Sequence, residues 1–189
     1  MHRSWIVACV AALAVTLAAC GSSSSSSSSL RPEGPNSPVG TVAPQPSGPN
    51  PSKSSKMVCE PEAQTELASS LGATATAVTT PTWVDHTYTC TYEYPNGSFT
   101  LSVKELDSAA LTTGYFNSLA ALLGRQPTRL ALAGGAFITT NGSVVARKDW
   151  KVLLVDVSHL PPSFGQPPQD QKDTAISIAA TILSCWSGA

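Results

Sequence analysis

A low-complexity segment near the start of the chain limits which residues can fold. Ser22 to Ser29 are eight consecutive serines, and seven prolines follow between Pro32 and Pro51. No aromatic residue occurs between Gly21 and Lys56. Such a composition buries too little apolar surface to offset the conformational entropy lost on folding. We therefore expect residues 20–56 to form a disordered tether and residues 57–189 to form a single domain.

The first twenty residues have the organisation of an export signal. Arg3 supplies a positive charge, and the apolar run of residues 5–14 is shorter than the about 20 residues that span a bilayer. Leu17-Ala18-Ala19-Cys20 resembles the lipobox of bacterial lipoprotein signal peptides. The resemblance implies cleavage after Ala19, which makes residues 1–19 the signal peptide, and attachment of a diacylglycerol to the sulfur of Cys20. The alternative is an ordinary signal peptide cut at an Ala-x-Ala-like site, with Cys20 incidental.

Lipidation at Cys20 fixes the expected location of the protein. Two or three acyl chains, palmitate among those expected, give stable anchoring where one chain is marginal. No later run of the sequence is long and apolar enough to cross a bilayer. We therefore expect a lipid-anchored protein on the outer face of the cytoplasmic membrane, with the membrane as the partner of Cys20.

The charge of the domain argues against nucleic acid as a partner. Residues 57–189 contain seven Lys and Arg against eleven Asp and Glu, and no basic stripe is visible. Five basic residues in the second half can gather on one side of a fold: Arg125, Arg129, Arg147, Lys148 and Lys151. A scattered, solvated surface is the interpretation that such a pattern favours.

Hydrophobic periodicity predicts three helices and six strands. The helices are expected at residues 60–71, between residues 108 and 124, and at residues 170–186, and the strands at residues 73–80, 87–94, 99–106, 136–140, 143–147 and 151–157. This αβββαβββα order is typical of an α+β fold, with an antiparallel sheet and helices packed mainly on one face.

Particular residues indicate how these elements face the core. Tyr88, Cys90, Tyr92 and Tyr94 alternate with polar residues, which predicts that they share the covered face of one strand. The second helix carries an apolar stripe at helical spacing, which we expect to face the core: Leu111, Tyr115, Leu119 and Leu122. Tight turns are expected at Pro95-Asn96-Gly97, Asn141-Gly142 and Lys148-Asp149.

Three short motifs support a resemblance to a known group of proteins. A helix begins at Cys59 and ends at Leu71-Gly72, a later strand contains Cys90-Thr91-Tyr92, and the chain closes with Cys185-Trp186. These features are similar to those of uncharacterised extracytoplasmic lipoproteins of actinobacteria. The resemblance implies that Cys59 pairs with Cys90, and it carries no established chemistry with it.

The cysteine spacing by itself leaves the disulfide open. Cys59, Cys90 and Cys185 allow three pairings, and at most one internal bridge forms. We prefer Cys59–Cys90, because a helix packed on the face that carries Cys90 brings Cys59 close to it. The main alternative is Cys59–Cys185, which would join the two ends of the domain.

The domain shows no recognisable catalytic, metal or cofactor motif. Asp156, Ser158 and His159 are sequence neighbours, whereas the members of a catalytic triad come together through the fold. His86 and His159 lack the spacing of a metal site.

A non-catalytic interaction or sensor-like module is therefore the leading hypothesis, with an envelope protein or an apolar ligand as its partner. The alternative is a carrier that holds an apolar envelope ligand between sheet and helices, recognisable by an internal cavity of a few hundred Å³. A cell-envelope hydrolase is the least favoured of the three.

The lipid anchor leads to the first prediction. Cys20→Ser removes the sulfur that carries the diacylglycerol, so the protein should leave the membrane fraction or accumulate unprocessed. Detergent partitioning and mass spectrometry of the wild type and the variant test this. Membrane association without any acyl mass, in either protein, would contradict the lipobox interpretation.

Overall fold

The structure is a computed structural model, and it describes residues 47–186. The predicted signal peptide, Cys20 and most of the predicted tether lie outside these residues. Four helices are present in the described part: α1 (Lys53–Met57), α2 (Pro61–Leu71), α3 (Ala109–Leu123) and α4 (Gln171–Cys185). The strands are β1 (Ala77–Val78), β2 (Thr82–Val84), β3 (Thr87–Tyr94), β4 (Gly97–Glu105), β5 (Gln126–Thr128), β6 (Gly135–Ile138), β7 (Val144–Lys148), β8 (Lys151–Asp156), β9 (Ser163–Phe164) and β10 (Gln169–Asp170).

Eight strands form one antiparallel sheet, as the α+β prediction requires. Its order is β1-β3-β4-β8-β7-β6-β5, and β2 also pairs with β3. The remaining two strands, β9 and β10, pair with each other. Within residues 47–186, no helix is both long and apolar enough to cross a membrane.

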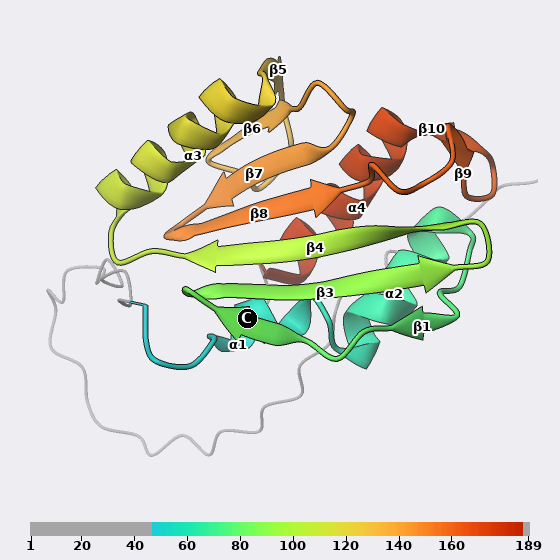
Figure 1. Cartoon of the computed structure of the whole chain (residues 1–189), viewed down its shortest axis with the longest axis horizontal. Coiled ribbons are helices and arrows are strands. Elements are labelled where there is room, and N and C mark those ends of the chain that lie inside the picture. The colour runs from blue at the N-terminus through green and yellow to red at the C-terminus, as the bar shows by residue number, and fades with distance from the viewer. Residues whose placement is uncertain (1–46, 187–189) are drawn as a thin grey trace, which may run out of the picture.

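Helices cover the two faces of the sheet unequally. The larger core lies between the sheet and the helices α2 and α4, which pass behind β3, β4 and β8 in Figure 1. A smaller core lies on the other face under α3, where Phe116 and Ala120 pack against Phe137, Val145 and Val152. The predicted packing of helices mainly on one face is confirmed, with α3 on the opposite face.

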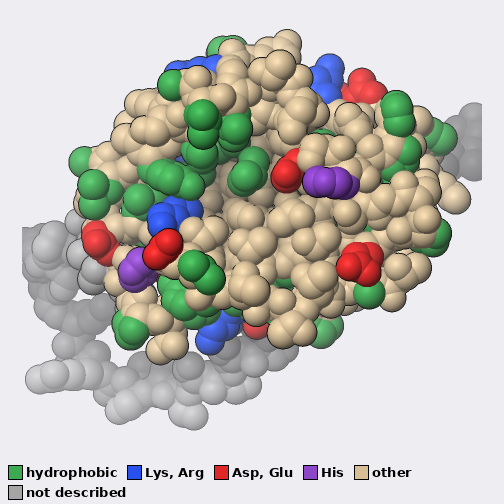
Figure 2. All heavy atoms as spheres, viewed as in Figure 1, with side chains coloured by type: hydrophobic (Ala, Val, Ile, Leu, Met, Phe, Trp, Pro, Cys, Tyr) green, Lys and Arg blue, Asp and Glu red, His purple; other side chains and the backbone are tan. Residues whose placement is uncertain are grey.

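The long hairpin of β3 and β4 has one apolar and one hydroxyl-bearing face. Tyr92 stacks on Phe99 in the larger core, with ring centroids 4.8 Å apart. On the opposite face the hydroxyls of Thr89 and Ser102 lie 3.1 Å apart, and neighbouring threonines form a similar pair. This face is mostly polar in Figure 2, whereas hydrophobic side chains gather around α3. The predicted alternation along residues 87–94 is therefore confirmed.

A disulfide joins Cys59 to Cys90, with Cα atoms 6.0 Å apart. The predicted pairing is confirmed, and the alternative Cys59–Cys185 is wrong because Cys59 is already bonded to Cys90. Cys185 is buried near the end of α4. Beside the bridge, the Tyr92 hydroxyl donates a hydrogen bond of 2.6 Å to the carbonyl of Val58. A loop closed over 31 residues stabilises a fold by roughly 3–4 kcal/mol in the chain-entropy model.

The prediction that residues 20–56 form a disordered tether is wrong for residues 47–56. These residues run into α1, and we call residues 47–57 the clasp. The backbone N–H of Ser52 donates to a carboxylate oxygen of Glu105 at 2.9 Å, and the Ser55 hydroxyl donates to the same oxygen. The Trp83 indole N–H donates to the carbonyl of Pro49 at 2.9 Å. The composition of residues 47–57 could not predict the clasp, because its hydrogen-bond partners lie about 30 to 50 residues further along the chain.

The predicted inward face of α3 is wrong for two of its four residues. Tyr115 and Leu119 are partly buried and pack against the smaller core, but Leu111 and Leu122 are 53% and 79% exposed. The residues of α3 that are buried are Thr112, Phe116 and Ala120. A leucine-rich helix offers several apolar faces at helical spacing, and here the aromatic Phe116 packs on Phe137 with ring centroids 5.1 Å apart. The apolar stripe therefore does not identify the buried face.

The shortest strands were either not predicted or predicted to be longer than they are. Only Ala77–Val78 pairs within the strand expected at residues 73–80. β2, β5, β9 and β10 contain two or three residues each, too few to show a period of two. Of the turn expected at Pro95-Asn96-Gly97, Pro95 and Asn96 form the turn, whereas Gly97 pairs with Tyr94 as the first residue of β4. Gly97 is needed there, since a Cβ atom would lie 2.5 Å from the carbonyl oxygen of His159.

The clasp leads to the second prediction. Glu105 is 2% exposed, so loss of a donor leaves its carboxylate poorly compensated. Ser55→Ala should lower the free energy of unfolding by about 1–3 kcal/mol in urea titrations. Ser54→Ala is the matched control in the same helix, and it should change stability by less than about 0.5 kcal/mol. Equal values for the two variants would show that the clasp does not stabilise the domain.

Candidate functional site

An open pocket on the α3 side of the sheet is lined by three arginines. It has a volume of about 350 Å³ and lies between α3, β5, the start of β6 and the end of β7. Arg125 precedes β5, Arg129 follows it, and Arg147 comes from β7. We call this the arginine pocket. Its other lining residues are Thr113, Phe116, Asn117, Pro127, Thr128, Gly134, Gly135 and Ala136.

Local packing fixes the side chain of Arg147. Its Nη1 donates a hydrogen bond of 2.9 Å to the hydroxyl of Thr113, and its guanidinium lies 5.7 Å from the centroid of the Phe116 ring. Gly135 leaves space for this arrangement, because a Cβ atom there would lie 3.1 Å from Nε of Arg147. The guanidinium is thus held in place by contacts with α3 and β6.

The end of α3 sets the positions of the other two arginines. Both the N–H and the hydroxyl of Thr140 donate to the carbonyl of Leu123, each at 3.0 Å. Gly124 turns the chain with φ of +78°, and a Cβ atom there would lie 2.2 Å from the Thr140 hydroxyl oxygen. The chain then enters β5, so Arg125 and Arg129 flank a strand of three residues.

The pocket carries excess positive charge. None of the residues that line it is Asp or Glu. Within residues 47–186, the one ion pair is between Lys172 and Asp173 on the surface, so none of the three guanidinium groups has a carboxylate within 4.0 Å. Arginine stays protonated in proteins and binds carboxylate or phosphate through two parallel hydrogen bonds. The arrangement is therefore suited to an anionic ligand.

The structure corrects the expectation of a scattered basic surface. Arg125, Arg129 and Arg147 meet in one pocket, whereas Lys148 and Lys151 are not among its lining residues. The Nζ atom of Lys151 lies 3.8 Å from the ring centroid of Trp150, and Lys151 is 6% exposed. Burial lowers the pKa of Lys151, and nearby Asp149 and Glu105 partly oppose this shift.

The residues considered for a catalytic triad do not form one. Ser158 and His159 approach each other, with the hydroxyl oxygen 3.2 Å from Nδ1. The carboxylate of Asp156 accepts instead from the Ser143 hydroxyl at 3.1 Å and from the Ser158 N–H at 2.9 Å. Asp156 therefore ties the end of β8 to the start of the next loop.

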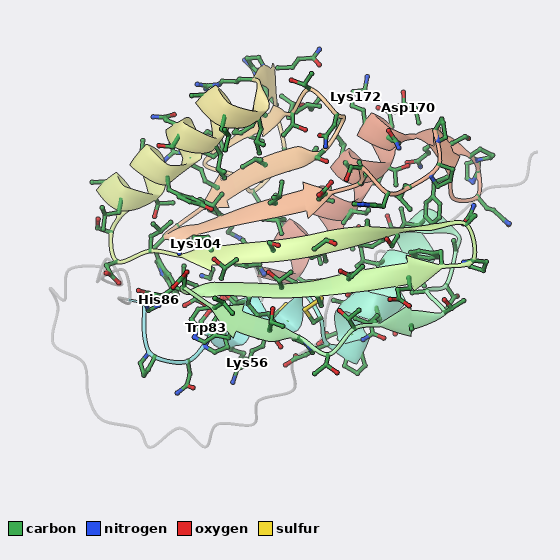
Figure 3. The ribbon with its side chains drawn as sticks, in the orientation of Figure 1. Lys56, Trp83, His86, Lys104, Asp170 and Lys172 are labelled. Atoms are coloured by element: carbon green, nitrogen blue, oxygen red, sulfur yellow. A yellow bond between two sulfur atoms is a disulfide. The ribbon has the colours of Figure 1, made fainter. Side chains whose placement is uncertain are left out.

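The two histidines lie apart from the arginine pocket. His86 follows β2 and packs edge-on against Trp83, with ring centroids 5.6 Å apart, as Figure 3 shows. His159 packs with Ser158 in the loop after β8. Among residues 47–186, no group of three His, Cys, Asp or Glu side chains is placed to hold a metal ion.

The space between α3 and the sheet bears on the apolar-carrier hypothesis. Tyr115 and Leu119 border a space there of about 30 Å³, which is close to the room needed by one water molecule. The carrier hypothesis expects an apolar cavity of a few hundred Å³. This part of the fold therefore offers it no support.

The chain was also compared with known proteins. No family model, curated protein or solved structure matches it. The arginine pocket therefore has to be interpreted from its own chemistry.

The contacts of Asp156 lead to the third prediction. Burial raises the pKa of Asp156, but hydrogen bonds from Ser158 and Ser143 outweigh it and hold the pKa below its ordinary value. A lowered folded-state pKa stabilises the fold above about pH 4, and this stability is lost as the pH falls through the lowered value. Asp156→Asn should therefore cost about 1–2 kcal/mol at pH 7.

Urea unfolding at several pH values provides the measurement. The difference between wild type and Asp156→Asn should shrink as the pH falls below about 4, where the unfolded carboxyl is protonated. A difference that is the same at pH 7 and pH 3 would show that the hydrogen-bonded carboxylate is not the source of the stability.

Proposed function

We propose that this protein is a lipid-anchored, non-catalytic binding module on the outer face of the cytoplasmic membrane, and that the arginine pocket binds an anionic ligand. The observation that carries the proposal is that Arg125, Arg129 and Arg147 line one open pocket with no Asp or Glu among its lining residues in the described part of the chain. The anchor at Cys20 rests on the lipobox resemblance.

The electrostatic repulsion among the three arginines supports a binding role. Like charges that face one pocket repel each other, and they do so more strongly where protein excludes water. An anion removes this repulsion and gains charge-assisted hydrogen bonds, which are about twice as strong as neutral ones. A surface with no ligand would gain nothing from holding three such groups together.

The chemistry of the lining groups supports binding over catalysis. A guanidinium stays protonated in proteins and therefore does not act as a general base near neutral pH. The hydroxyl of Thr113 accepts from Arg147 and donates to the carbonyl of Ala109 at 2.8 Å, so both of its functions are in use. These groups orient and neutralise a ligand.

Thermal unfolding of the full lipidated chain in detergent tests the pocket and gives the fourth prediction. Sodium phosphate should raise Tm above the value in sodium chloride at equal ionic strength, by about 3–5 °C at ten times Kd. The triple variant Arg125→Gln, Arg129→Gln, Arg147→Gln should lose this increase, because the anion loses its partners.

A charge-matched control separates the pocket from general electrostatics. The triple variant Lys53→Gln, Lys56→Gln, Lys172→Gln removes the same charge from exposed positions. It should keep the phosphate-specific increase in Tm. Equal losses in both triple variants, or no phosphate effect in the wild type, would contradict the proposed binding site.

A further inference from the structure

A second pocket adjoins the arginine pocket and shares Arg125 with it. It has a volume of about 270 Å³, and its other lining residues are Gln126, Ile138, Thr139 and Thr140. Gln126 and Ile138 are paired across β5 and β6, so this space lies at the edge of the sheet. We call it the threonine pocket. A ligand that binds at Arg125 has room to extend into it.

The hydrogen bonds of the threonine pocket define what it can bind. The Thr140 hydroxyl donates its hydrogen to the carbonyl of Leu123 at 3.0 Å. The Thr139 hydroxyl donates to the side-chain oxygen of Asn141 or to the carbonyl of Ser143. Each hydroxyl has one hydrogen, so both oxygens are left to accept. The oxygen of the exposed Thr140 hydroxyl can therefore accept a hydrogen bond from a ligand, such as a hydroxyl group of a polyol.

The side chain of Gln126 adds to this preference. It is exposed at the edge strand β5, and its amide can both donate and accept. No lining residue of the threonine pocket other than Arg125 carries a charge. The pocket therefore suits a neutral hydroxylated group joined to the anion.

The charge of the arginine pocket favours phosphate over carboxylate. A carboxylate carries one negative charge, whereas a phosphate monoester carries about −1.5 to −2 at neutral pH and has three acceptor oxygens. A phosphate has an acceptor oxygen for each of the three guanidinium groups that line the pocket. A single carboxylate would leave most of the positive charge without a partner.

We propose that the two pockets together bind a phosphorylated polyol, with the phosphate in the arginine pocket and the hydroxyl groups in the threonine pocket. This inference rests on the proposed function and narrows its ligand. Such a group occurs in soluble sugar phosphates and in lipid headgroups that carry a phosphate monoester on a polyol, such as that of phosphatidylinositol 4-phosphate, and the test separates these sources.

Calorimetric titration of the full chain tests the ligand class and is the fifth prediction. The probes are inorganic phosphate, glucose 1-phosphate, glucuronate and glucose. We expect glucose 1-phosphate to bind at least tenfold more tightly than inorganic phosphate, because the hydroxyl groups add contacts, and we expect glucuronate and glucose to bind more weakly than both. Gln126→Ala should reduce the advantage of glucose 1-phosphate several-fold, whereas Gln166→Ala, a glutamine in the separate pocket beside Tyr94, should not.

The outcomes distinguish this inference from the proposed function. Phosphate binding without an advantage for glucose 1-phosphate, or tighter binding of glucuronate, would overturn the inference and leave the anion site standing. No binding of any anion would overturn both. Vesicles of phosphatidylcholine with and without phosphatidylinositol 4-phosphate identify the source. Selective binding to phosphatidylinositol 4-phosphate supports a headgroup ligand, and binding of glucose 1-phosphate alone supports a soluble one.

Discussion

The pairing of β4 with β8 is the interaction on which the rest of the fold depends. It joins the hairpin of the first half of the domain to the strands of the second half, from Thr100 opposite Asp156 to Glu105 opposite Lys151. Leu101 and Leu153 then face α2 and α4, while Val152 and Leu154 face α3. A slip of one residue would exchange these faces, so the two cores together fix the register. The same pairing places Glu105 at the end of β4, where the clasp donates hydrogen bonds to its carboxylate.

The arginine pocket follows from the way α3 is placed on this sheet. Phe116 in α3 packs on Phe137 in β6, and the carbonyl of Leu123 at the end of α3 accepts a hydrogen bond from Thr140, shortly after β6. These two contacts fix α3 against β6. Arg147 on the neighbouring strand then meets α3 at Thr113, and the short β5 brings in the other two arginines. Three arginines that line one pocket with no Asp or Glu among its described lining residues form a local excess of positive charge, and such an excess is expected at functional sites.

The sequence predicted the helices and strands whose own residues show a clear periodicity or clear start and stop residues. Residues 87–94 are a strand with the expected bounds, and the helix that ends at Gly72 was expected from its proline and acidic start. The inward face of α3 was not predictable, because Leu111 and Leu122 are as apolar as the residues that are buried. The sequence named the three arginines of the arginine pocket but favoured a scattered surface for them. Arg125 and Arg129 flank β5, Arg147 lies on β7, and only the tertiary fold brings the two segments to one pocket.

The central claim is that three arginines act together as one anion site, and NMR observes it directly. In a titration of the ¹⁵N-labelled protein with inorganic phosphate at constant ionic strength, the Nε–Hε signals of Arg125, Arg129 and Arg147 can be followed individually. The account predicts that all three shift and saturate with one common Kd, together with the amide of Gly135 beside them. Shifts that do not saturate, or that saturate for residues outside the pocket while these three stay unchanged, would contradict it.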